Sequence, residues 1–235
     1  MEKLKFLHCG DSALTVQFSN KIDEEVNVRI RALSNALSKL NIKGLIETVP
    51  TFSAITVYYD PLIISFSKLK KIIIKADKNR IDAQKVKKRV FLVPVCYEGD
   101  YAPDLENVLK FTNLTKEELI KIHTCKDYLI YMLGFLPGFA YLGGMDERIA
   151  CKRLEVPRTE IVEGSVGIGG NQTGIYPLKS PGGWQIIGRT PCKLYDETSD
   201  SPVLYKAGDY IRFFQISKEE FLSGKYDELK WEERL

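Results

Sequence analysis

The apolar positions in the first third of the chain follow the spacing of strands and of helices in turn. Residues 5–7 and 13–18 predict two strands around a turn at Gly10 and Asp11, and residues 45–49 and 54–58 predict a hairpin. Between them, residues 23–40 predict an amphipathic helix, because apolar side chains recur four, three, four and three positions apart: Val26, Ile30, Leu33, Leu37 and Leu40. A second helix is predicted from Phe66, with its lysines on the face opposite the apolar one. We therefore expect an N-terminal α+β domain over residues 1–89.

A second domain is expected from Val90 onward, and its pattern changes to short strands after Asp127. Residues 90–96 predict an apolar strand, and residues 103–110 and 115–124 predict short helices, the second opened by Thr115 and Glu118 as a capping box. Short β-like runs separated by glycine and proline then follow, at residues 128–133, 164–168, 174–176, 184–188, 193–195 and 210–216, before a weak helical stripe at 218–222. The fold class expected is α+β, with a C-terminal β-barrel or sandwich over residues 90–235.

Glycine and proline are concentrated in one stretch of the C-terminal part. Residues 134–191 hold 12 of the 17 glycines and five of the 10 prolines. Glycine permits positive φ and close approach, and proline fixes φ, so this density predicts a shaped backbone surface. The alternative is a β region with many tight turns and no ligand.

The amino-acid composition indicates a globular protein but does not decide its function. Hydrophobic residues make up 44% and charged residues 28%, which is typical of a globular protein with a real core. The net charge is +3, but residues 68–89 are strongly basic; without aromatic stacking residues, this favours a solvated helix face and connector over a nucleic-acid site. Five separated cysteines, no signal peptide and no membrane span predict reduced thiols in a cytoplasmic protein.

The sequence motifs of several familiar catalytic sites are absent or incomplete in this chain. The chain has no G-x-x-x-x-G-K-[ST] phosphate loop, and the G-x-G-x-x-G pattern that begins at Gly167 breaks at Gln172. Two histidines and no cysteine pair are too few for a zinc site, so we expect no metal cluster. Ser165 does not form a nucleophile elbow, because the residue two positions before it is Glu163 and not glycine.

A few residues within or near the glycine-rich stretch remain as candidates. Arg158 and Arg189 follow stiff backbone and suit a carboxylate or phosphate, with structural salt bridges as the alternative. Gln172 and Tyr176 offer polar groups that also serve turns, and Trp184 suits either a ligand platform or a core. His123 is favoured as a capping or core-edge residue over a catalytic one.

Taken in order, these motifs resemble a known family. Residues 134–144, 156–158, 164–177 and 180–191 look like the family of 5-oxoprolinase B subunits, also called allophanate hydrolase subunit 1, which includes the sporulation-kinase inhibitor KipI. Weaker matches at Gly10, Asp60, His123 and Asp209 extend the resemblance over nearly the whole chain. One departure is Lys152, where the family has proline.

The resemblance implies a cyclophilin-like barrel in the C-terminal domain and a place in an ATP-dependent hydrolase. That enzyme opens 5-oxo-L-proline to L-glutamate, and its other members are a carboxyltransferase-like protein, the C subunit, and a LamB/YcsF-like protein, the A subunit. We expect ATP to bind in the complex rather than to this chain alone. On this basis the expected catalytic residues are His123, Arg158 and Arg189, and the expected substrate- or partner-binding residues are Pro137, Phe139, Tyr141, Gln172, Tyr176 and Trp184.

Two other functions fit the same resemblance. The chain can instead be a KipI-type inhibitor that binds the dimerisation helices of a sensor histidine kinase and blocks its autophosphorylation. Prolyl isomerase activity is a third alternative, and it depends on fold analogy alone.

Overall fold

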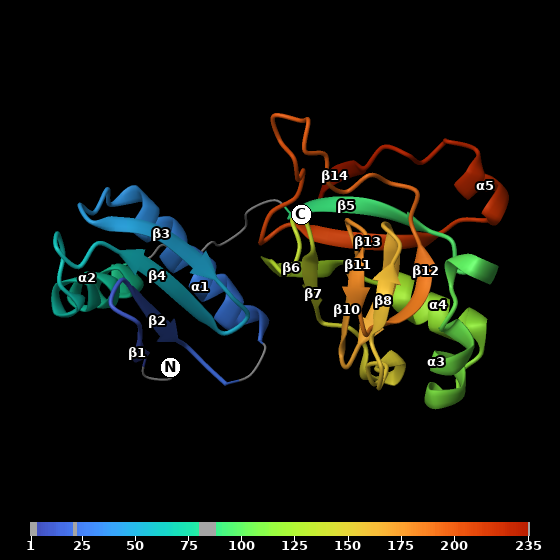
Figure 1. Ribbon diagram of the computed structural model, residues 1–235, viewed down its shortest axis with the longest axis horizontal. Coiled ribbons are helices and arrows are strands. Elements are labelled where there is room, and N and C mark those ends of the chain that lie inside the picture. Colours follow the sequence, from blue (N-terminus) through green and yellow to red (C-terminus); the bar gives the residue numbers. More distant parts are fainter. Residues whose placement is uncertain (1–3, 21–22, 80–87, 235) are drawn as a thin grey trace. The chain divides into compact units, whose positions relative to one another are not determined.

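The computed structural model describes residues 4–20, 23–79 and 88–234. The chain forms two compact units, Met1–Val86 and Lys87–Leu235, which are described separately below (Figure 1). The basic connector predicted after Asn79 falls mostly on residues 80–87, outside the described residues.

The first unit packs helices on a four-stranded antiparallel sheet with strand order β1-β2-β4-β3. Its elements are β1 (Lys5–Cys9), β2 (Ala13–Gln17), α1 (Glu24–Lys39), β3 (Leu45–Pro50), β4 (Ala54–Tyr59) and α2 (Phe66–Asn79). They lie within one or two residues of the predicted strands and helices. The side chain of Asp23 caps α1 by accepting from the Val26 N–H.

The two helices bury the stripes that their sequences predict. Ile30, Leu33 and Leu37 of α1 form one core with Leu69 and Ile73 of α2 and with apolar residues of β2 and β4. Leu40, which the spacing places on the same stripe, is instead 54% exposed because α1 has already ended at its C-cap. The buried stripes thus account for the packing of the helices on the sheet.

The second unit contains an eight-stranded sheet of order β12-β9-β10-β7-β6-β13-β5-β14 and a separate β8–β11 pair. Its strands are β5 (Lys88–Val95), β6 (Tyr128–Leu133), β7 (Ala140–Gly143), β8 (Arg158–Ile161), β9 (Ser165–Gly169), β10 (Gln172–Ile175), β11 (Ser180–Gly182), β12 (Gln185–Arg189), β13 (Tyr210–Gln215) and β14 (Lys230–Arg234). Its helices are η1 (Gly99–Tyr101), α3 (Leu105–Thr112), α4 (Lys116–Thr124), η2 (Glu147–Ile149) and α5 (Lys218–Leu222). The capping box predicted at Thr115 is present. The strand predicted at residues 193–195 is wrong, since that segment is irregular.

The predicted cyclophilin-like barrel is not confirmed. Within the described residues the large sheet has two ends, β12 and β14, and no continuous ladder joins them. A single bridge links the end of β12 to the residue after β5: the N–H of Cys96 donates to the Arg189 carbonyl at 2.9 Å, and the Arg189 N–H donates back at 3.0 Å. The supported description is a large sheet with helices.

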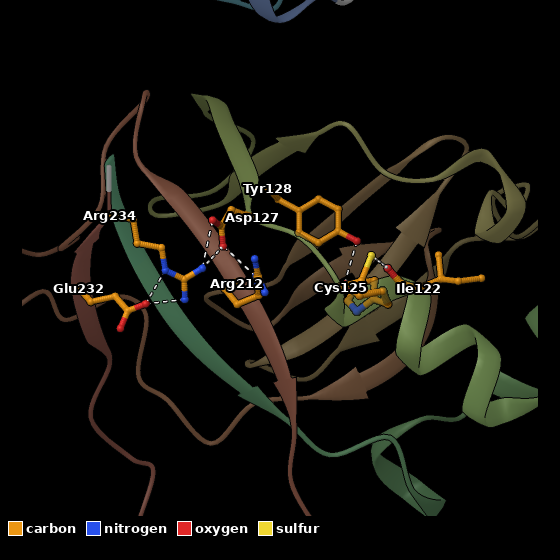
Figure 2. Close-up of polar contacts among 8 residues, drawn as sticks. Ile122, Cys125, Asp127, Tyr128, Arg212, Glu232 and Arg234 are labelled. Atoms are coloured by element: carbon orange, nitrogen blue, oxygen red, sulfur yellow. Dashed lines mark hydrogen bonds and ion pairs between the residues drawn. The ribbon is translucent and has the colours of Figure 1, made fainter. Parts of the chain in front are cut away.

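Ion pairs to Asp127, the residue just before β6, link β13 and β14. Figure 2 shows the Asp127 carboxylate between the guanidinium groups of Arg212, on β13, and Arg234, on β14. Their nitrogens lie 2.8 and 2.9 Å from Asp127 Oδ1, and Arg234 also pairs with Glu232. No helix among the described residues is long and apolar enough to span a membrane.

Candidate functional site

Glycines of β9 and β10 leave the backbone of the sheet without side chains beneath a small aromatic cluster; we call this glycine surface the bare floor. The cluster, which we call the Trp184 cluster, consists of Phe139, Ile161, Tyr176, Trp184 and Ile186. A Cβ at Gly169 would stand 2.4 Å from Trp184 Nε1, and one at Gly174 would stand 3.1 Å from the same indole ring. The glycine density therefore lets large aromatic rings lie directly on the backbone of the sheet.

Replacing Gly169 by alanine is expected to destabilise the protein. The new methyl group would overlap the rigid indole, and such overpacking costs roughly 1–3 kcal/mol. The matched control is Gly134→Ala, because a Cβ there meets only the flexible Met132 Cε, at 3.4 Å. Urea unfolding of both variants measures the difference; equal stability would show that the indole does not require the bare floor.

The Tyr176 hydroxyl lies inside this cluster. Burial is the main reason that the pKa of Tyr176 rises to about 12, while a backbone hydrogen bond with Trp184 and the charges of Arg153 and Arg158 oppose the rise. The phenol therefore stays protonated at neutral pH. It can donate a hydrogen bond but does not serve as a base there.

Arg158 is occupied by an ion pair within the chain. Its Nη1 and Nη2 donate to Asp104 Oδ2 and Oδ1 at 2.8 and 2.6 Å, in a bidentate pair. The Asp104 side chain is 2% exposed and also accepts from the Ile186 N–H at 2.7 Å. The salt-bridge interpretation fits Arg158 better than ligand binding, since both of its terminal nitrogens already have a partner.

His123 lies in the core rather than at a site. Its side chain has no solvent exposure, with Nδ1 2.7 Å from Tyr97 Oη and Nε2 2.9 Å from Thr173 Oγ1. Because the Thr173 hydroxyl donates to the Gly167 carbonyl, it accepts from Nε2–H, and Nδ1 then accepts from Tyr97. Burial lowers the pKa of His123 to about 3. The imidazole is therefore neutral near pH 7, and its burial agrees with the interpretation of His123 as a core-edge residue.

Arg189 faces a pocket with a volume of about 770 Å³. Its Nε donates to the Glu163 carbonyl at 2.9 Å, and its guanidinium carbon lies 5.9 Å from the centre of the Phe221 ring. Neither terminal nitrogen has a hydrogen-bond or ion-pair partner among the described residues. Arg189 is thus held in place by backbone and ring while it keeps two donors for a carboxylate or phosphoryl oxygen.

The structure distributes the predicted residues over separate places. Pro137 and Arg189 line the pocket of about 770 Å³ described above, which we call the Arg189 pocket. Phe139, Tyr176 and Trp184 form the Trp184 cluster, with Tyr141 packed against it and Gln172 at the start of β10. His123 and Arg158 belong to neither of these two groups.

Two aromatic residues were not among the predicted site residues. Phe221 of α5 and exposed Phe135 were not predicted, although Phe135 holds a positive φ of 70° beside the predicted Pro137. A bulky residue in that conformation is strained, and such strain often marks a binding loop. No group of three or more potential metal ligands occurs in the described parts of the chain.

A family model and a full-length relative show which family this chain belongs to. Residues 4–205 match the family model described as the carboxyltransferase domain, subdomain C and D. A relative from Bacillus subtilis (strain 168), named as the B subunit of 5-oxoprolinase, is 42% identical over 226 residues, which cover 92% of this chain and 94% of that protein. The chain therefore belongs to the family of 5-oxoprolinase B subunits.

Larger proteins contain a similar segment. The urea amidolyase of Lachancea kluyveri is 26% identical over 93% of this chain, which corresponds to 14% of that protein. The crystal structure of TTHA0988 superposes with a TM-score of 0.76 at 32% identity, covering 87% of this chain and 40% of that chain. The chain thus spans less than half the length of both proteins.

Proposed function

We propose that this chain is the B subunit of an ATP-dependent 5-oxoprolinase that hydrolyses 5-oxo-L-proline to L-glutamate. The observation that carries the proposal is the 42% identity, over nearly the full length of both chains, to a protein that carries this name. The companions we propose are the carboxyltransferase-like C subunit, together with the LamB/YcsF-like A subunit. The likeness to segments of longer amidolyases supports a role beside other catalytic parts.

The chemistry of lactam hydrolysis requires ATP, and within it this chain would bind a charged group of the substrate. A lactam carbonyl is resonance-stabilised, and phosphorylation of its oxygen by ATP would make the carbon open to attack by water. We place ATP in the assembled complex, as a substrate shared between its proteins. Arg189 would neutralise a carboxylate or phosphoryl oxygen with the two terminal nitrogens that lack a partner among the described residues, and the ring of Phe221 would keep the guanidinium oriented.

A second part of the proposal concerns the shape of the large sheet. The pair of hydrogen bonds between Cys96 and Arg189 brings the last residue of β12 against the chain just after β5. We propose that the large sheet curls into a cyclophilin-like barrel at this point. Arg189 would then lie at the seam, where the curvature positions its side chain toward the pocket.

Reconstitution tests the proposal. Glutamate formation from 5-oxo-L-proline is expected only when this chain, both companions and ATP are present together. Hydrolysis by the companions without this chain would contradict the proposal, as would hydrolysis by this chain alone. Inhibition of a sensor kinase by the isolated chain, without glutamate formation by the complex, would favour the KipI-type alternative.

A further inference from the structure

The Arg189 pocket holds charges of both signs that do not neutralise one another. Besides Arg189, three acidic residues line it: Glu163, Glu197 and Asp227. None of their carboxylates has a hydrogen-bond or ion-pair partner in the part of the chain that the structure describes. Opposite charges that share a cavity without pairing favour a ligand that carries both charges, because each charge of the ligand then meets its counterpart.

Asp227 is the best fixed of the three acidic residues. Its carbonyl accepts from the Lys193 N–H at 3.4 Å, which ties its backbone to the segment after β12. The Lys193 ammonium does not neutralise the Asp227 carboxylate, since its Nζ lies 3.0 Å from Asp196 Oδ1. Burial raises the pKa of the Cys192 thiol to about 11, and the charge of Asp227 adds to the rise. The carboxylate therefore lies close to Cys192, another residue of the pocket lining.

The reaction proposed above makes a ligand with both charges from one that has only the negative charge. 5-Oxo-L-proline carries a carboxylate and a neutral lactam N–H. In the net ring opening, the oxygen of one water adds to the lactam carbon, the C–N bond breaks, and both protons of that water end on the nitrogen. L-glutamate therefore carries an ammonium group, a donor of three hydrogen bonds, which the lactam lacks.

We propose that the Arg189 pocket binds an α-amino acid zwitterion, with Arg189 holding a carboxylate and Asp227 the ammonium group. The choice of L-glutamate as this amino acid rests on the proposed function. Asp227 then distinguishes the opened product from the closed lactam by charge. A volume of about 770 Å³ admits a ligand of this size together with water.

Ligand binding to the isolated full-length chain tests the proposal without turnover. Isothermal titration calorimetry at constant ionic strength compares L-glutamate with glutarate, which has the same two carboxylates but no ammonium group. The native chain is expected to bind L-glutamate about tenfold more tightly, since a hydrogen bond between charged groups is among the strong ones. Equal affinity for the two ligands, or binding of neither, would overturn the proposal.

Two neighbouring variants show whether Asp227 is responsible. Asp227→Asn and Glu228→Gln each remove one exposed carboxylate, but only Asp227 lines the pocket. Asp227→Asn is expected to weaken L-glutamate binding about tenfold without weakening glutarate binding, and Glu228→Gln to change neither. Equal effects of the two variants would overturn the assignment.

The inference and the proposed hydrolase function can fail separately. If the reconstituted complex forms glutamate while the isolated chain binds L-glutamate no better than glutarate, only this inference is wrong. If the isolated chain prefers L-glutamate through Asp227 while the complex forms no glutamate, the amino acid site stands and the hydrolase function is wrong.

Discussion

Replacing Arg158 by alanine is expected to lower the free energy of unfolding by about 3 kcal/mol. The substitution leaves the Asp104 carboxylate buried, with the Ile186 N–H still donating to it but without the two donors of Arg158. Breaking a buried ion pair typically costs about 3–5 kcal/mol, and the lower end applies because a third of the Arg158 side chain is solvent-exposed. Chemical denaturation measures the change.

The matched control is Arg148→Ala. Arg148 makes the same kind of bidentate pair with Asp146, but its side chain is 68% exposed, so solvent screening leaves little to lose. A further comparison, Arg158→Ala combined with Asp104→Ala, is expected to recover part of the loss because no buried charge remains. If Arg158→Ala were as stable as Arg148→Ala, the interpretation of Arg158 as a structural residue would be wrong.

Acid is expected to destabilise the protein strongly through His123. Its pKa is about 3 in the folded state against an ordinary value of 6.5, so between these values the unfolded chain binds a proton that the folded chain refuses. The stabilisation is complete above pH 6.5 and falls with pH by about 1.4 kcal/mol per unit down to about pH 3. At pH 4.5 the His123 contribution to the loss is therefore about 3 kcal/mol.

His123→Gln is the test, because glutamine can bond Tyr97 or Thr173 without titrating. The variant is expected to be less stable at neutral pH, yet to show a shallower fall of unfolding free energy between pH 6.5 and 4. His8→Gln, which replaces the only other histidine and leaves His123 buried, is expected to keep the steep fall. Parallel pH profiles for the native chain and His123→Gln would refute the buried, neutral imidazole.

Elements with local signals were predictable. The apolar stripe and the Asp23 cap determine α1, and the Thr115 box determines α4, because both depend on residues within one or two turns. Strand β14 was missed because its residues are charged and mostly exposed, and only its pairing with β5 makes it a strand. At residues 193–195 the β-like pattern failed because Lys193 donates its N–H to the distant Asp227 carbonyl, not to a neighbouring strand.

The site was predictable as a region but not as a set of roles. Glycine density pointed to the stretch in which Trp184 packs on Gly169 and Gly174, since a missing side chain is visible in the sequence. The partner of Arg158 lies 54 positions earlier in the chain, and the Thr173 partner of His123 lies 50 positions later. Such pairings depend on the tertiary fold, so the sequence could not separate a ligand-binding arginine from a paired one.

The central claim is that Arg189 presents two donors to the substrate of a multi-subunit hydrolase. The most direct measurement is the kcat/KM for 5-oxo-L-proline of the reconstituted complex carrying Arg189→Ala, beside complexes carrying the native chain and Arg148→Ala. Loss of charge-assisted hydrogen bonds is expected to lower kcat/KM roughly 10- to 100-fold for Arg189→Ala, with Arg148→Ala unchanged. Native turnover by a stably assembled Arg189→Ala complex would contradict the account.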